Sequence, residues 1–200
     1  MHKTNHFPSS LQPRPAHKHP RPNFLPYRSP LLRVFENITM AAVQSLLRPV
    51  FALVGWTFAM EGWMYATRLP AMTKYKVKTD PNFSKEKLNN QIPASVRWKA
   101  DNYDHLHEAP TRFYAVALGL ALYASTSPAS LTTNFMATEA NLAWMYVGLR
   151  VVHSIVQASA NPVMIRFGIF AASEITMLGL LIKGATAVWA AKSSGSVIGL

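Results

Sequence analysis

The chain lacks cysteine entirely, and it carries few charged residues for its length. The absence of cysteine excludes disulfides, cysteine-ligated metal sites and cysteine nucleophiles. Charged residues make up 14% of the 200 residues, whereas hydrophobic residues make up 50%. Acids are scarcest: nine Asp and Glu stand against twenty Lys and Arg, which gives a formal net charge of +11. So little charge is unusual for a soluble domain of this size.

Common catalytic and metal-binding motifs are also missing. The sequence has no glycine-rich phosphate loop, no HExxH motif, and no serine or threonine with an evident His and Asp partner. One group, Asp104, His105, His107 and Glu108, offers metal-ligating side chains, but its spacing matches no standard pattern. The sequence therefore predicts no metal site and no catalytic triad.

Residues 1–39 form a basic segment with seven prolines, and its only acid is Glu36. Prolines at this density block helices, and the segment has too little apolar surface to fold alone. Three interpretations stay open: a disordered tail, a transit peptide, or an extension upstream of a natural start at Met40. We therefore treat 1–39 as a disordered or removable N-terminal extension, and 193–200 as a flexible C-terminal tail.

Four apolar stretches follow, each close to the ~20 residues that a membrane-spanning helix needs. None has the charged stripe of a helix on the surface of a soluble bundle. A polar run from about Ser95 precedes the second stretch, so that its helix is expected to begin early and project beyond the bilayer. The predicted fold class is all-α, an integral-membrane four-helix bundle over residues 40–192. The stretches are residues 44–69, 109–126, 139–159 and 163–190.

The distribution of basic residues predicts an orientation. The loop between the first two stretches is rich in Lys and Arg, whereas the loop between the second and third has none. The positive-inside rule therefore places the first and third loops on the cytoplasmic side, with both termini opposite. The basic extension 1–39 contradicts this arrangement unless it is removed. The basic residues of the first loop are Lys74, Lys76, Lys78, Lys85, Lys87, Arg97 and Lys99.

The third stretch carries four polar residues at i, i+4, i+7 and i+11, a spacing that puts them on one helix face. They are Tyr146, Arg150, His153 and Gln157. A charge at mid-membrane costs at least ~2.5–3.5 kcal/mol and normally faces a partner or a wet cavity. Two interpretations follow. Arg150 pairs with Glu61 or Glu174 as structural glue between helices, or the whole stripe faces a polar cleft between protomers and holds an anionic ligand.

The polar run before the second stretch, "RWKADNYDHLHEAPTRFY", gives a second group of polar residues. If the run is helical, Asp101, His105, Glu108 and Arg112 share one face, and Asn102 lies about 100° away. A solvated helix end with i,i+4 pairing is the simpler interpretation. Pro110 would kink this helix or lie in its first turn.

Three segments resemble the MAPEG family, the membrane-associated proteins in eicosanoid and glutathione metabolism. They are "LVGWTFAMEGWMYATRLPAM", "ADNYDHLHEAPTRFYAVAL" and "AWMYVGLRVVHSIVQASAN", and the resemblance spans roughly residues 42–190. The pattern Asn-Tyr-x-His-Leu-x-Glu-x-Pro resembles a little-characterised branch, largely bacterial with fungal members. The resemblance implies a four-helix transmembrane protomer, a homotrimer, and glutathione bound between protomers near the cytoplasmic side.

The resemblance also implies a set of glutathione-binding residues, carried over position by position. The helix-two candidates are Asn102 and Glu108, with Arg97 or Lys99 in place of the family arginine. Glu108 follows Asn102 by six residues, whereas in the family transferases the spacing is three. The arginine that activates the thiol has no clear counterpart, and Arg166 is a loose candidate. The helix-three candidates are Tyr146, Arg150, His153 and Gln157.

These observations leave two main functions open. The first is a glutathione-dependent transferase or peroxidase acting on lipophilic electrophiles or hydroperoxides, with glutathione as cosubstrate. The second is a non-catalytic membrane protein that uses the same fold for assembly or lipid binding. A small transporter is a third interpretation, but no inverted repeat accompanies it. The expected partners are membrane lipid, further copies of the chain and a small lipophilic substrate, without nucleic acid, and the endoplasmic reticulum and mitochondria are not distinguished.

Overall fold

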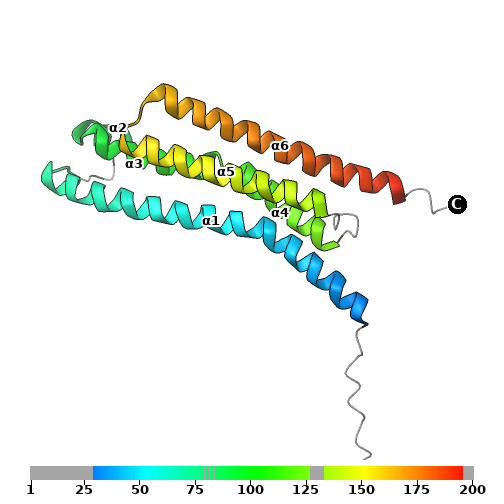
Figure 1. The fold of residues 1–200 in the computed structure, drawn as a ribbon. Helices are drawn as coiled ribbons and strands as arrows, with labels where there is room; N and C mark the ends of the chain where they lie inside the picture. Colours follow the sequence, from blue (N-terminus) through cyan, green and yellow to red (C-terminus); the bar gives the residue numbers. More distant parts are fainter. Residues whose placement is uncertain (1–28, 79, 81, 83, 127–132, 196–200) are drawn as a thin grey trace, which may run out of the picture.

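The computed structural model describes residues 29–78, 80, 82, 84–126 and 133–195, with the backbone alone for 133–136 and 191–195. This part of the chain is helical throughout its regular structure and contains no strand, which confirms the predicted all-α class. The long helices run side by side, and two shorter ones lie together at one end (Figure 1). The helices are α1 (Pro30–Lys74), α2 (Lys85–Gln91), α3 (Ala94–Glu108), α4 (Thr111–Thr126), α5 (Thr133–Ser159) and α6 (Val163–Gly195).

All four predicted stretches fall in helices, namely α1, α4, α5 and α6. Two of these helices are long and apolar enough to cross a membrane, α1 and the Val163–Ala190 part of α6. α4 has 16 residues, about 24 Å at 1.5 Å per residue, and polar side chains interrupt the apolar run of α5. The described residues thus provide six helices where the sequence predicted four, because α2 and α3 form separate elements at the polar end.

α1 begins at Pro30, inside the segment that the sequence assigned to a removable extension. Ser29 caps it, since its hydroxyl accepts a hydrogen bond from the Leu32 N–H at 3.3 Å, and proline suits the first helical position. Residues 1–28 of that extension lie outside the described residues, as do residues 196–200 of the predicted C-terminal tail.

The first turns of α1 slope away from the other helices (Figure 1). The internal Pro49, which lacks an N–H, accounts for such a bend.

Of the two possibilities left open for Pro110, a kink or a helix start, the structure has the second: a break at Ala109–Pro110 separates α3 from α4. Pro110 has no N–H for the α3 ladder, and its carbonyl instead accepts from the Tyr114 N–H at 3.0 Å to begin α4. The Thr111 hydroxyl donates to the Glu108 carbonyl at 2.9 Å across the break. Arg112 therefore leaves the face that it was predicted to share with Asp101 and His105.

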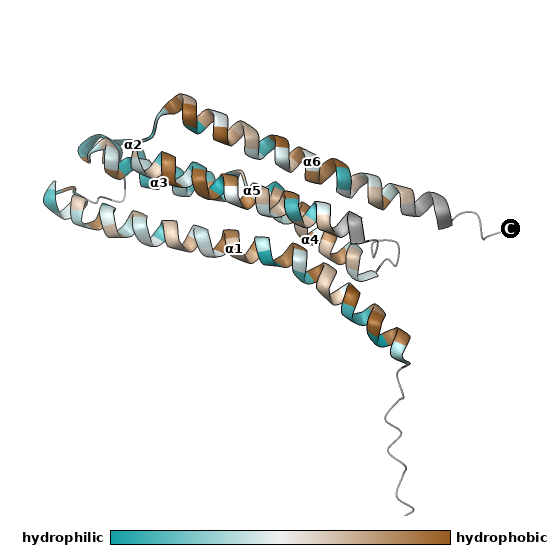
Figure 2. Cartoon of the chain, in the orientation of Figure 1, coloured by the Kyte–Doolittle hydropathy of each residue, from teal (hydrophilic) through white to brown (hydrophobic). Residues whose placement is uncertain are grey.

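The bundle is apolar both inside and outside. Leu46, Leu53 and Phe113 are fully buried in the core, where the Phe113 ring stacks on the Tyr146 ring at 4.7 Å between centroids. Large apolar side chains also cover the exterior, among them Ile175 and Trp189, each 72% exposed. Hydrophilic residues gather at the α2–α3 end, whereas apolar ones recur along α6 and in the first turns of α1 (Figure 2). A continuous apolar exterior indicates contact with lipid or with a partner.

Gly184 gives a test of the α4–α6 packing. A Cβ at this position would lie 2.9 Å from Cδ2 of the buried Leu120, so the Leu120 side chain or one of the two helices has to shift. A Cβ at Gly168, on the same helix, meets nothing within 4 Å. We expect Gly184→Ala to be less stable than Gly168→Ala by about 1–2 kcal/mol, as for other overpacked sites. Thermal unfolding of both variants in one detergent measures the difference, and equal stability would show that Leu120 adapts freely.

Candidate functional site

The predicted polar stripe of α5 is a single buried face. Tyr146, Arg150, His153 and Gln157 are at most 2% exposed, which confirms that the four side chains point the same way. They are buried within one chain, and His105 of α3 and Phe170 of α6 contact them. The prediction that Arg150 and His153 face a cleft between protomers is therefore wrong for this structure. Helices α3 and α6 of the same chain already cover that face of α5.

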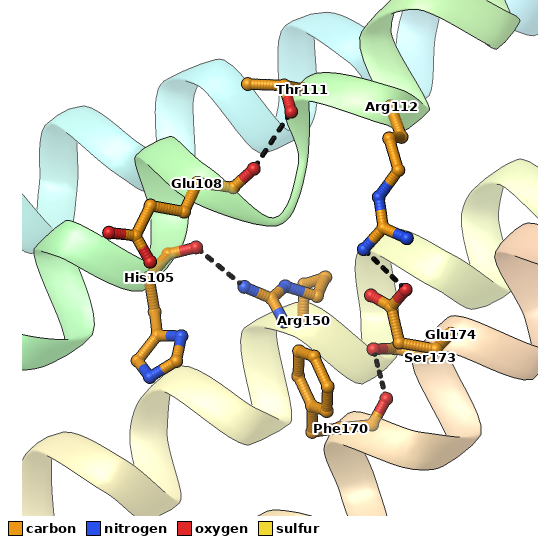
Figure 3. A network of polar contacts seen from close by, with 8 residues as sticks. All are labelled: His105, Glu108, Thr111, Arg112, Arg150, Phe170, Ser173 and Glu174. Atoms are coloured by element: carbon orange, nitrogen blue, oxygen red, sulfur yellow. Dashed lines mark hydrogen bonds and ion pairs between the residues drawn. The ribbon is translucent and has the colours of Figure 1, made fainter.

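Figure 3 shows Arg150 between His105 of α3 and Phe170 of α6. One guanidinium nitrogen, Nη2, donates to the His105 carbonyl at 3.0 Å, and the group lies 5.7 Å from the centroid of the Phe170 ring. The other two nitrogens, Nε and Nη1, are buried without a hydrogen-bond partner. A guanidinium has five N–H donors, so most of its hydrogen-bonding capacity is unused.

The predicted ion pair of Arg150 with Glu61 or Glu174 is wrong. Glu174 accepts from Nη2 of Arg112 at 2.7 Å (Figure 3), and Glu61 lies near the Tyr103 phenol. Glu108 has an exposed side chain. Glu174 still attracts Arg150 electrostatically, and its Oε1 is buried without a hydrogen bond. The Glu174 carboxylate thus lies between the exposed Arg112 and the buried Arg150.

His153 and Gln157 extend the buried polar face toward the end of α5. Nδ1 of His153 lies 3.1 Å from the Arg166 carbonyl, and its Nε2 lies 3.0 Å from Oε1 of Gln157. Arg166, the loose candidate for thiol activation, donates from Nη1 to Oδ1 of Asn161 at 2.6 Å. Asn161 has a φ of 52° in the turn after α5, a conformation that asparagine tolerates better than most residues. Arg166 therefore braces the α5–α6 turn.

The predicted site residues of α3 differ in their burial and in their contacts. Asn102 is fully buried, and neither oxygen nor nitrogen of its amide has a partner. Lys99 donates to the Ser95 and Ala158 carbonyls at 2.8 and 3.1 Å, and lies 5.2 Å from the Trp63 ring centroid. Burial lowers the pKa of the Lys99 ammonium. Arg97 is half-buried with an unpaired Nε, whereas Glu108 is exposed. Lys99 thus ties α3 to the end of α5, and Asn102 is left unsatisfied.

The structure adds His105 to the site and shows a further buried acid about three turns from Arg150 on α5. The half-buried His105 ring lies 6.1 Å from that of His153 and 6.5 Å from that of Phe170. Burial and, secondly, the Arg150 charge lower the pKa of the His105 imidazole, which favours its neutral form. Glu139, also on α5, is fully buried with both carboxylate oxygens unpaired. Glu139 precedes Arg150 by eleven residues, a spacing that places both on one helix face. The predicted polar stripe began at Tyr146 and therefore did not include it.

Within the described residues, the acids and histidines around residue 105 do not gather into a metal site. Asp104 forms an ion pair with Lys85, and Nδ1 of His107 donates to the Tyr103 carbonyl at 2.9 Å. Arg150 and Tyr146, a cation and a phenol, do lie close enough to interact, and this pair suits an acceptor-rich or anionic organic ligand.

The sequence model of the MAPEG family matches residues 46–186, from the middle of α1 to the last third of α6. The chain belongs to the MAPEG family. This family consists of membrane-associated helical bundles, in agreement with the all-α fold and with the two long apolar helices. No curated protein and no solved structure matches the chain. The MAPEG match includes all the predicted glutathione-binding residues, from Arg97 to Gln157.

Proposed function

We propose that this MAPEG protein crosses the membrane several times and binds glutathione at the end of the bundle where α3 packs against α5. The observation that carries the proposal is a set of unsatisfied buried atoms. Asn102, Tyr146 and Arg150 each bury at least one polar atom without a hydrogen-bond partner. Each such group costs about 1–3 kcal/mol in the folded state. A ligand that satisfies these atoms would explain why they are retained.

The chemistry of glutathione fits these residues. Its two carboxylates suit the unused Arg150 donors and the cations Arg97 and Lys99. A thiol has a pKa near 8.5, and a nearby cation favours its nucleophilic thiolate. His105 is only half-buried, so this group of residues is open to solvent on one side. A lipophilic electrophile or hydroperoxide would approach through the bilayer, and a homotrimer would cover part of the apolar exterior.

Calorimetric titration of glutathione into the purified protein in detergent tests the proposal. Saturable binding below millimolar concentration supports it, and glutathione with both carboxylates esterified should bind at least tenfold more weakly. No heat at several millimolar glutathione would refute it. Release of product from a model electrophile then separates transferase activity from simple binding.

Tyr146→Phe distinguishes a ligand site from structural glue. The change keeps the stacked ring and removes one buried hydroxyl that has no partner. We expect unchanged or slightly higher stability, together with about tenfold weaker glutathione binding, a loss of ~1.4 kcal/mol. Tyr114→Phe is the matched control, because the Tyr114 hydroxyl is not among the buried polar groups that lack a partner. Its loss should lower stability and leave glutathione affinity unchanged.

A non-catalytic role is the second candidate, and one observation favours it. Arg150 and Lys99 both donate to main-chain carbonyls of neighbouring helices, His105 and Ala158, as residues that hold a bundle together do. In that case the polar face fixes the positions of α3, α5 and α6, and the protein serves assembly or lipid binding. No glutathione binding by the unchanged protein at several millimolar would favour this role.

A further inference from the structure

A cavity of about 410 Å³ lies between α1, α3 and α4. None of its lining residues belongs to the predicted glutathione-binding set. The volume falls within the range of small-molecule sites, which is roughly 300–1,000 Å³. Its polar and aromatic lining comes from Thr57, Phe58, Glu61, Tyr103, His107 and Tyr114.

Glu61 is the only acid in this lining, and the lining contains no lysine or arginine. Its carboxylate acts electrostatically on the nearby Tyr103 phenol, and in the described part of the chain no salt bridge includes it. Burial and, after it, the Glu61 charge raise the pKa of the Tyr103 phenol, which therefore stays neutral and donates. A half-buried carboxylate within an apolar helix is costly unless a cation balances it. No cation of the described chain does so.

Aromatic rings complete the surroundings of Glu61. Phe58, Tyr103 and Tyr114 come from three different helices, and each lines the cavity. The Tyr103 phenol lies close enough to Glu61, and the Tyr114 phenol close enough to Thr57, for each ring to interact with α1. Aromatic faces attract cations, most strongly where water is excluded. A carboxylate among aromatic rings is a site for an ammonium group.

We propose that this cavity binds a lipophilic amine or quaternary ammonium compound. The cationic head would lie at Glu61 between the tyrosine rings, and the apolar body would lie against Phe58 and Leu106. The bare carboxylate disfavours anionic glutathione here, so this site is separate from the one around Arg150. The cavity lies where the polar helix α3 meets the apolar helices α1 and α4, and an amphipathic ligand suits that position.

Equilibrium dialysis of octyltrimethylammonium against the full-length protein in zwitterionic nanodiscs tests the proposal. We expect saturable binding above the partition into empty nanodiscs, and at least tenfold weaker binding to Glu61→Gln. The glutamine keeps the shape and can still accept from Tyr103. Glu86→Gln removes an exposed acid of α2 and should change the affinity less than twofold.

Octyl sulfate and octanol, with the same chain but a negative or neutral head, should show no saturable binding. Equal affinity of Glu61→Gln and the unchanged protein for octyltrimethylammonium would overturn the proposal, as would competition by octyl sulfate. If Glu61→Gln does not assemble, Tyr103→Phe replaces it. That change removes the phenol hydroxyl beside the carboxylate, so affinity for the cation should rise, and unchanged or lower affinity contradicts the site.

Discussion

Arg150→Ala should lower the free energy of unfolding by about 3–5 kcal/mol, the largest effect expected of any substitution at the site. Arg150 is fully buried, so truncation leaves a cavity and removes the donor to the His105 carbonyl. Denaturant or thermal unfolding of the detergent-solubilised protein measures the loss. Arg112→Ala is the control, because the Arg112 side chain is 63% exposed and surface ion pairs contribute ~0–1 kcal/mol.

Arg150→Met separates volume from charge. Methionine fills much of the space of the arginine stem without a buried cation, and apolar replacement of buried ions is often neutral or stabilising. We therefore expect Arg150→Met to lose less than about 1.5 kcal/mol, the usual limit for volume-conserving changes. If Arg150→Met were as unstable as Arg150→Ala, the charge itself would hold the fold, and packing would be the minor term.

Arg150→Met should also weaken glutathione binding by about 10- to 150-fold, which corresponds to the ~1.5–3 kcal/mol of a hydrogen bond to a charged group. The reason is that Nε and Nη1 are buried donors without a protein acceptor, available to a carboxylate or thiolate. Calorimetry on the folded variant measures the change. Arg166→Met is the comparison, because Arg166 bonds Asn161, and it should alter affinity less than threefold. A larger loss of glutathione affinity in Arg166→Met than in Arg150→Met would instead indicate an anion site at the α5–α6 turn.

The sequence predicted the helices well and their interruption poorly. Long apolar runs locate α1, α4, α5 and α6, because only a helix satisfies the backbone over such a length in an apolar setting. Pro110 was recognised as a disturbance, but the sequence left a kink and a new start equally open. The outcome depended on the Thr111 hydroxyl and the Pro110 carbonyl, which together begin α4. Local polar contacts of this kind are not visible in an apolar pattern.

The site, too, could be predicted only in part from the sequence. Periodicity placed Tyr146 to Gln157 on one face, since that depends only on helix geometry. Their partners depend on which helix packs across that face, and spacing along the chain carries no such information. Arg150 therefore bonds a main-chain carbonyl that no motif marks, and Glu174 pairs with Arg112, 62 positions away. The same limit explains why the stripe was assigned to a cleft between protomers when a single chain buries it.

The length of α1 bears on which bilayer suits the protein. A straight helix of 45 residues would extend about 68 Å, more than twice the ~30 Å hydrocarbon core. The part from Val50 to Lys74 extends about 37 Å, which a modest tilt accommodates. The turns before Pro49 slope away and carry exposed apolar side chains such as Leu31 and Phe35, so on the proposed topology they lie along the headgroup region. Hydrophobic matching to a thin or a thick membrane then depends on the segment after the proline, and shortening the arm before it leaves that preference unchanged.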